Sequence, residues 1–143
     1  MGNKILFVDD EPNVLRAYTR QLRKQFHIET ALGGEEGLRA IMNQGPYAVI
    51  VSDLRMPGMD GIQFLSRVKE LSPDSVCMML TGHADLQTTI EVINEGNIFR
   101  FMCKPCNPDV LAHSLNSGLE QYRLITAEKR LIEQIKTLSI TDP

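Results

Sequence analysis

Side chains that can do chemistry stand directly after four short apolar runs of the chain. In chain order these are Asp9, Asp10 and Glu11, then Ser52 and Asp53, then Thr81, and finally Lys104 with Pro105. Clustered carboxylates raise each other's pKa unless a cation lies between them. Oxygen ligands that are few and partly solvated suit Mg²⁺, which often shares its site with a phosphate. A carboxylate held between Mg²⁺ and a lysine could therefore attack a phosphoryl group and form an acyl phosphate.

Each of these residues has a simpler interpretation when it is taken alone. An Asp-Asp pair before a helix is most often an N-terminal cap that complements the helix dipole. A threonine after a strand is usually a turn residue, and a lysine there is usually solvated. All of them standing together at successive strand ends is what favours one shared site.

The apolar runs that precede these residues predict a buried parallel sheet. Short stretches that are apolar on successive residues are typical of strands covered on both faces. Four such stretches are clear, and 27–31 is a weaker candidate nearer an edge; the four lie at 5–8, 48–51, 76–80 and 98–102. Patterns with helical spacing alternate with them, at 12–22, 35–43, 62–71, 86–93 and 107–122. Strict alternation predicts a doubly wound α/β fold whose ligand site lies beyond the carboxyl ends of the strands.

The bulk properties are those of one ordinary globular domain. The chain has 143 residues, of which 43% are hydrophobic and 23% charged, with a net charge of −3. This acidic balance argues against direct binding of nucleic acid. No apolar stretch approaches the length that spans a membrane, and the N-terminal run is too short for a signal peptide. We therefore expect a cytoplasmic protein, whose three cysteines are reduced thiols.

The segment Cys103-Lys-Pro-Cys106 has the spacing of a dithiol or of half a zinc site. A zinc site lacks a second pair of ligands. A thiol oxidoreductase is disfavoured because a proline and a chemically useful lysine stand between the thiols. The lysine is thus the expected functional residue, and a redox effect of the two cysteines on it stays open.

Four segments in this order resemble the receiver domain of two-component response regulators. They are Ile5-Leu-Phe-Val-Asp-Asp-Glu-Pro12, Asp53-Leu-Arg-Met-Pro-Gly-Met-Asp-Gly61, Leu80-Thr-Gly82 and Phe101-Met-Cys-Lys-Pro105. The resemblance covers 4–122, and we take 1–122 as the receiver domain. It implies a flavodoxin-like (βα)5 fold with a five-stranded parallel sheet in the order 2-1-3-4-5. It also implies a phosphorylation-dependent signalling switch rather than an enzyme with a separate substrate.

The resemblance implies roles for the acidic residues. Asp53 would accept a phosphoryl group from a histidine kinase or a phosphotransfer protein. Asp10 would bind Mg²⁺ directly and Asp9 through water, and Asp53 and the backbone carbonyl of Arg55 would complete the protein ligands.

The remaining roles concern the phosphoryl group and the switch. Thr81 and Lys104 would contact the phosphoryl oxygens, and the Lys104–Pro105 peptide would be cis. Phe101 would turn inward when Thr81 moves and so change the face made by the fourth helix, fifth strand and fifth helix. Arg55 and His83 would tune the lifetime of the phosphorylated state.

Residues 123–143 keep a helical composition beyond the predicted domain. Leu124, Leu131 and Leu138 are seven residues apart, Ile135 lies between two of them, and Glu128 weakens the pattern. This extension would either pack on its own domain or a neighbour, or lead as a signalling helix to an output domain. It also allows a homodimer. The segment 93–101 is similar to receivers fused to HD-type phosphodiesterases or other outputs.

Two other classes share parts of this pattern. A flavodoxin-like redox protein would place FMN phosphate where Asp9, Asp10 and Glu11 would repel it. A phosphatase of the haloacid dehalogenase type needs a second aspartate two residues after its nucleophile, and Arg55 occupies that position.

Overall fold

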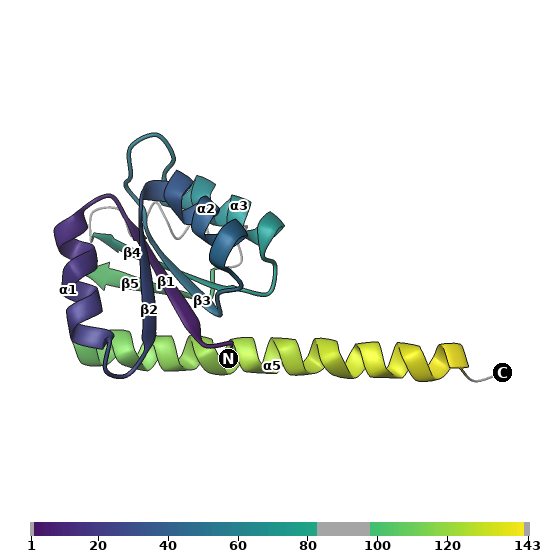
Figure 1. Cartoon of the computed structure of the whole chain (residues 1–143). Helices are drawn as coiled ribbons and strands as arrows, with labels where there is room; N and C mark the ends of the chain where they lie inside the picture. Colours follow the sequence, from purple (N-terminus) through teal and green to yellow (C-terminus); the bar gives the residue numbers. More distant parts are fainter. Residues whose placement is uncertain (1, 83–97, 142–143) are drawn as a thin grey trace.

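The structure, a computed structural model, describes residues 2–82 and 98–141. Its centre is one parallel sheet in the order β2-β1-β3-β4-β5, as predicted (Figure 1). The strands are β1 Lys4–Asp9, β2 His27–Leu32, β3 Val49–Asp53, β4 Val76–Gly82 and β5 Arg100–Lys104. The weak candidate over 27–31 is indeed an edge strand, because β2 pairs with β1 and ends the sheet.

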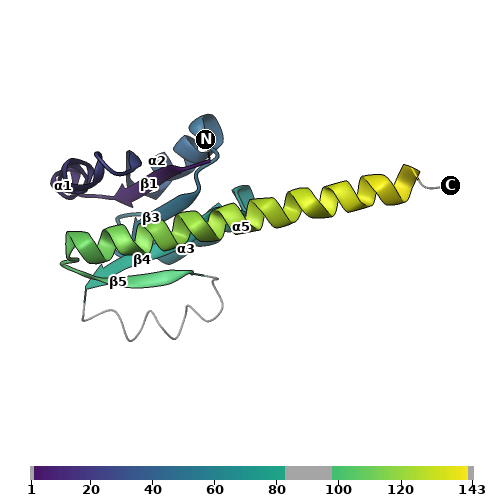
Figure 2. The same ribbon diagram turned by 90° about the horizontal axis from the view of Figure 1, so that it is seen from below.

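Helices cover both faces of the sheet. They are α1 Pro12–Leu22, α2 Gly33–Gln44, α3 Gly61–Leu71 and α5 Pro108–Thr141. Helices α1 and α5 lie on one face, and α2 and α3 lie on the other (Figures 1 and 2). The helix predicted over 86–93 falls outside the described residues. No helix in the ranges that the structure describes is both long and apolar enough to cross a membrane.

The alternation of side chains along β1 explains why its apolar run is continuous. Ile5 and Phe7 face the core under α1 and α5, whereas Leu6 and Val8 face the core under α2 and α3. All four are at most 2% exposed. A strand that is covered on both faces has no polar side, so the sequence of β1 shows no alternation of polar and apolar residues.

Among the starts of the elements, those of α2 and β5 differ most from the prediction, by two residues each. Helix α2 begins at Gly33 rather than at residue 35, because the Glu36 carboxylate accepts a hydrogen bond from the Leu32 backbone N–H at 2.9 Å. Strand β5 begins at Arg100 rather than at residue 98. The N–H of Phe99 still bonds to the Cys77 carbonyl, but regular pairing with β4 starts only at Arg100.

Helix α5 is a single helix of 34 residues, roughly 50 Å long at 1.5 Å per residue. Its first half packs on the sheet, where Leu111 and Leu115 are fully buried. From 127 to 138 every side chain is exposed, and this part projects beyond the sheet (Figure 2). An ion pair between Lys129 and Asp74, 2.6 Å long, holds the start of this part to the domain. Apart from this ion pair, the exposed side chains of 127–138 are not buried against the described part of the domain.

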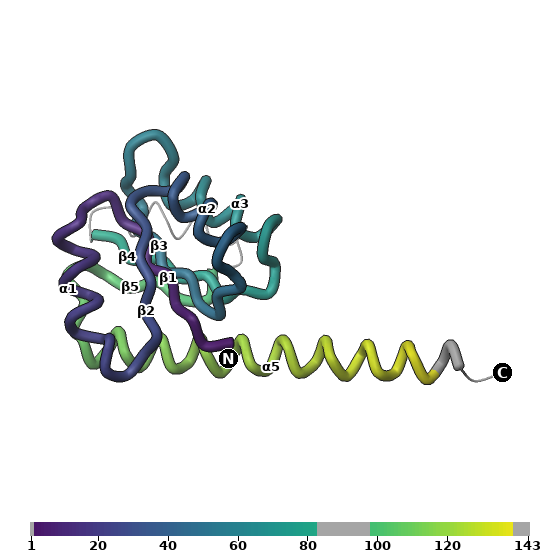
Figure 3. The backbone as a smooth tube through the Cα atoms, in the orientation of Figure 1, coloured from purple at the N-terminus to yellow at the C-terminus, as the bar shows by residue number. Residues whose placement is uncertain are grey.

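The chain starts beside this helix. Figure 3 traces the N-terminal end of the described chain to the middle of α5. At Gly2, a side chain would meet the ring of Tyr122 at 3.6 Å.

Candidate functional site

The predicted polar residues meet where the strands have their C-terminal ends, which we call the carboxyl edge of the sheet. Asp9 ends β1, Asp53 ends β3 and Lys104 ends β5, while Thr81 is the last residue but one of β4. The strand register aligns them, because Gly82 pairs with Lys104 and Val8 pairs with Ser52. Parallel strands bring their carboxyl ends to the same edge, so residues that are distant in sequence come together there.

The ammonium group of Lys104 bridges two carboxylates. Its Nζ lies 3.0 Å from Oδ2 of Asp9 and 3.1 Å from Oδ1 of Asp53. Only 4% of the Asp9 side chain and 14% of the Asp53 side chain are exposed. Hydrogen bonds between ionised groups are the stronger kind, and they gain further strength where little water reaches them.

Three carboxylates gather around this lysine. Oxygen atoms of Asp9, Asp10 and Asp53 all lie within 4.8 Å of one another. Backbone N–H groups orient two of them: that of Glu11 donates to Asp9 at 3.0 Å, and that of Leu54 donates to Asp53 at 2.9 Å. When all three carboxylates are ionised, Lys104 balances only one charge, and two negative charges remain for a divalent cation.

The pKa values of the central pair reflect this crowding. Burial raises the pKa of Asp53; the Lys104 ammonium lowers it, the charge of Asp9 raises it, and the net direction is upward. Burial would by itself lower the pKa of Lys104, but hydrogen bonds and charges from Asp9 and Asp53 together raise it. The lysine is thus kept as a cation, while an ionised Asp53 is held at some cost in free energy.

Thr81 carries a buried hydroxyl group that no other described residue satisfies. The residue is 1% exposed, and its Oγ1 has no hydrogen-bond partner within the described ranges. Buried hydroxyl groups are nearly always paired, so an unpaired one at the edge of an acidic cluster is suited to a ligand. Phe101 is half-buried and packs against the core under α2 and α3.

The loop after Asp53 owes its shape to a glycine that the sequence analysis used only as part of a motif. A Cβ on Gly61 would collide with the backbone carbonyl of Asp53 and would lie 2.9 Å from Cα of Leu54. The N–H of Gly61 instead donates to the Leu54 carbonyl at 2.7 Å. Asp60 then caps α3 in a capping box with Gln63, and Gly58 turns the loop at a φ of 81°. This loop holds the Asp53 backbone in place.

Two sequence features at this edge now have a location. Glu11 is exposed and contributes its backbone N–H rather than its carboxylate, so it does not belong to the acidic cluster.

The Lys104–Pro105 peptide is cis, as predicted. Cys103 and Cys106 lie on either side of it and form no disulfide within the described ranges, and burial raises the pKa of Cys106. The predicted His83 lies outside the described residues.

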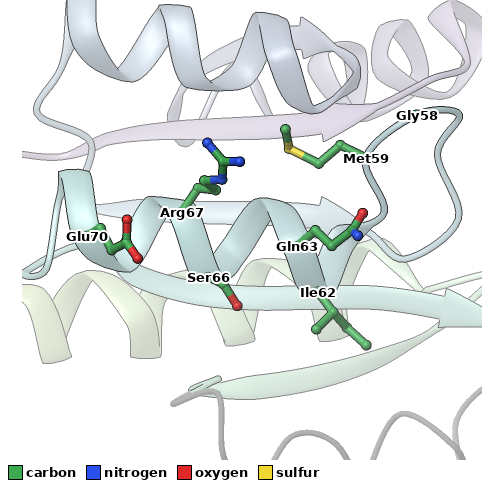
Figure 4. A pocket seen from close by; sticks show the side chains of 7 residues that line it. All are labelled: Gly58, Met59, Ile62, Gln63, Ser66, Arg67 and Glu70. Atoms are coloured by element: carbon green, nitrogen blue, oxygen red, sulfur yellow. The ribbon is translucent and has the colours of Figure 1, made fainter.

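A separate groove of about 420 Å³ runs along α3. Figure 4 shows Met59 and Arg67 on the same side of this helix, with Glu70 at one end. None of the residues that line the groove belongs to the acidic cluster. This groove is therefore separate from the acidic cluster at the strand ends.

Comparison with known proteins identifies the family. The family model described as "Response regulator receiver domain" matches residues 5–116. A curated relative, the hydrogenase transcriptional regulatory protein HoxA of Cupriavidus necator, is 33% identical over 93% of this chain and 27% of its own length. The transcriptional regulatory protein GlrR of Escherichia coli is 30% identical over 96% of this chain and 34% of its own length. The chain thus spans about a third or less of the length of these relatives.

Comparison with solved structures supports the same family. A crystal structure of adenylate cyclase from Rhodopirellula baltica is 39% identical with a TM-score of 0.89, over 93% of this chain and 98% of that one. The signal receiver domain of an HD domain-containing protein from Pseudomonas fluorescens is 27% identical with a TM-score of 0.78, over 86% and 98% of the two chains. The chain belongs to the response regulator receiver domain family, whose members act in phosphorylation-dependent signalling.

Proposed function

We propose that Asp53 is the phosphoryl acceptor of this receiver domain. The observation that carries the proposal is the position of Lys104, which places one cation between Asp53 and the buried Asp9 at nearly equal distances. The donor is the phosphohistidine of a histidine kinase or a phosphotransfer protein. A carboxylate oxygen of Asp53 forms a bond to phosphorus, the phosphorus–nitrogen bond of the donor breaks, and the electron pair returns to the imidazole.

The residues around Asp53 fit Mg²⁺. Carboxylate oxygens of Asp9, Asp10 and Asp53 are its preferred kind of ligand, and their excess charge of two matches one divalent cation. We assign the backbone carbonyl of Arg55 as a further protein ligand. When bound, the ion would neutralise charge on the transferred phosphoryl oxygens. The chain itself contributes the Lys104 ammonium to the same oxygens.

Thr81 and Phe101 form the proposed switch. The unpaired hydroxyl of Thr81 gains a partner when a phosphoryl oxygen arrives, which favours movement of Thr81 toward Asp53. Phe101 lies on the neighbouring strand, and its half-buried ring fills the vacated space. The altered surface beside β5 and α5 is then read by an output domain or a partner protein.

The nature of the output is not common to the relatives. HoxA and GlrR are transcriptional regulators, one structural neighbour is an adenylate cyclase, and another is a receiver of an HD domain-containing protein. The last of these supports an HD-type output for this chain, and the cyclase supports an enzymatic output more generally.

Phosphorylation by acetyl phosphate with Mg²⁺ tests the proposal. The parent chain should gain the mass of one phosphoryl group, and a chelator should abolish the gain. Asp53→Asn should abolish it as well, because an amide oxygen is not a nucleophile of this kind. Asp74→Asn is the matched control, since it removes a carboxylate from the opposite edge of the sheet. Undiminished labelling of Asp53→Asn would refute the assignment.

A further inference from the structure

The C-terminal part of α5, from Leu124 onward, exposes a line of large apolar side chains. Leu124 is 53% exposed, Leu131 and Ile135 are each 57% exposed, and Leu138 is 69% exposed. We call these four residues the tail stripe. Large apolar side chains that gather on one exposed face of a folded domain mark an interaction site.

The tail stripe faces away from its own domain. At 100° per residue, it lies roughly 150° around the helix from Leu111 and Leu115, which anchor α5 on the sheet. Lys129, which reaches Asp74 of the domain, lies on the anchoring side. A second helix can therefore lie along the stripe without meeting the body of the domain; Figure 2 shows this end of α5 extending beyond the sheet.

The spacing of the tail stripe is that of a helix that pairs with a copy of itself. Leu124, Leu131 and Leu138 repeat every seven residues and take the d positions of a heptad, and Ile135 takes the a position between the last two. Leucine at d with a β-branched residue at a favours two parallel strands. A stripe on this repeat is complementary to itself when two copies lie in register.

The charges outside the stripe suit the same partner. Lys129, Arg130, Glu133 and Lys136 take the b, c and f positions, away from the e and g positions that flank the interface, so their charges do not meet across the dimer. Glu128 is the exception, because it takes the other a position and would face its counterpart across the dimer.

We propose that the tail stripe binds a second copy of this chain as a parallel, in-register coiled coil over residues 124–138. Two such short stripes bury an area toward the low end of specific interfaces, under about 1,200 Å². With the repulsion at Glu128, this makes the dimer weak and dependent on concentration. The dimer does not depend on the chemistry at Asp53, so it persists in Asp53→Asn.

Sedimentation velocity on the full chain across a concentration series tests the dimer. The mass should rise from 16.1 kDa toward twice that value. Leu131→Asp should abolish the rise, because it places a charge in the interface. Thr137→Asp adds the same charge on the opposite side of the helix and should leave the dimer intact. Glu128→Leu should lower the dissociation constant at least about tenfold, the equivalent of 1.4 kcal/mol.

The parallel register is tested by disulfide formation in a background without Cys103 and Cys106. Under an added thiol oxidant, Leu138→Cys should cross-link two chains, since the d positions of parallel helices are adjacent. Thr137→Cys should not. In an antiparallel pair residue 138 would lie near residue 124 instead, and neither variant would cross-link.

Three results would overturn the proposal. A parent chain that keeps a mass of 16.1 kDa at every concentration excludes the dimer. A dimer that survives Leu131→Asp uses another surface. A dimer that forms but fails to cross-link through Leu138→Cys excludes the parallel register.

Discussion

The carboxyl edge of the sheet and the tail stripe depart from the usual distribution of residues in opposite ways. At the edge, charge is buried: Asp9 is only 3% exposed. In the stripe, apolar surface meets water: Leu138 is 69% exposed. Folded domains normally bury apolar side chains and leave charges outside. Both regions therefore carry a cost in stability, and both are the regions for which we propose a binding role.

The two regions differ in how they are held. The edge is built by β1, β3, β4 and β5 together, and Lys104 reaches an aspartate 95 residues earlier in the chain. The stripe belongs to one helix and is set only by its periodicity. A change at the edge should thus alter both the chemistry and the fold, whereas a change in the stripe should alter association alone.

The largest expected effect is on phosphorylation. Lys104→Met removes the cation between Asp9 and Asp53, and we expect the rate of labelling by acetyl phosphate to fall about 100- to 1,000-fold. Lys69→Met, an exposed lysine on α3, is the control and should keep the parent rate. A fall of less than threefold in Lys104→Met would show that the ammonium group does not act on the phosphoryl oxygens.

A matched pair of leucines in α5 gives the next effect. Leu115→Ala opens a cavity in the core and should lower the free energy of unfolding by about 3 kcal/mol. Leu131→Ala removes the same atoms from a surface position. At low protein concentration it should change the free energy of unfolding by no more than about 0.5 kcal/mol. Urea unfolding measures both. Equal losses would mean that the projecting half of α5 is packed in solution.

The smallest expected effect is on the free energy of unfolding, which an ionised Asp53 lowers. Its pKa is raised in the folded chain, chiefly by burial, so the ionised form opposes folding. With a chelator present, Asp53→Asn should raise the free energy of unfolding near neutral pH, by within about 1 kcal/mol. The gain should vanish as the pH falls below 3.8, the ordinary pKa of this carboxyl, because the parent is then neutral too.

A loss of stability in Asp53→Asn at neutral pH would contradict this sign. It would mean that the contact with Lys104 outweighs burial and the repulsion from Asp9. Mg²⁺ should reverse the order of the two proteins, because it stabilises the parent through a carboxylate that the variant lacks.

The positions of the site residues could be predicted because each follows a recognisable buried strand. Parallel pairing then forces Asp9, Asp53 and Lys104 to one edge. The sequence could not show which carboxylates the lysine would reach, since that depends on the sheet order and on side-chain conformation. The role of Gly61 was missed for a related reason: a backbone contact with Asp53 leaves no periodic pattern, only a glycine.

The fold was likewise predictable where it depends on local pattern. Continuous apolar runs gave the strands, and the absence of a breaker after Tyr122 indicated that α5 continues. Whether the tail returns to the domain depends on surfaces that are distant in sequence. Contacts such as the ion pair of Lys129 with Asp74 determine where α5 separates from the domain, and no pattern in the sequence predicts such a contact.

The straight, continuous course of α5 makes it a lever. Its base packs on β3 and β4, two strands that end at or beside the acidic cluster, and its tip lies roughly 20 Å beyond Thr126, the last half-buried residue of the helix. A tilt of about 10° at the base displaces such a tip by about 4 Å. A rigid rod of this kind converts a small rearrangement of packed side chains into a movement that a distant neighbour can detect.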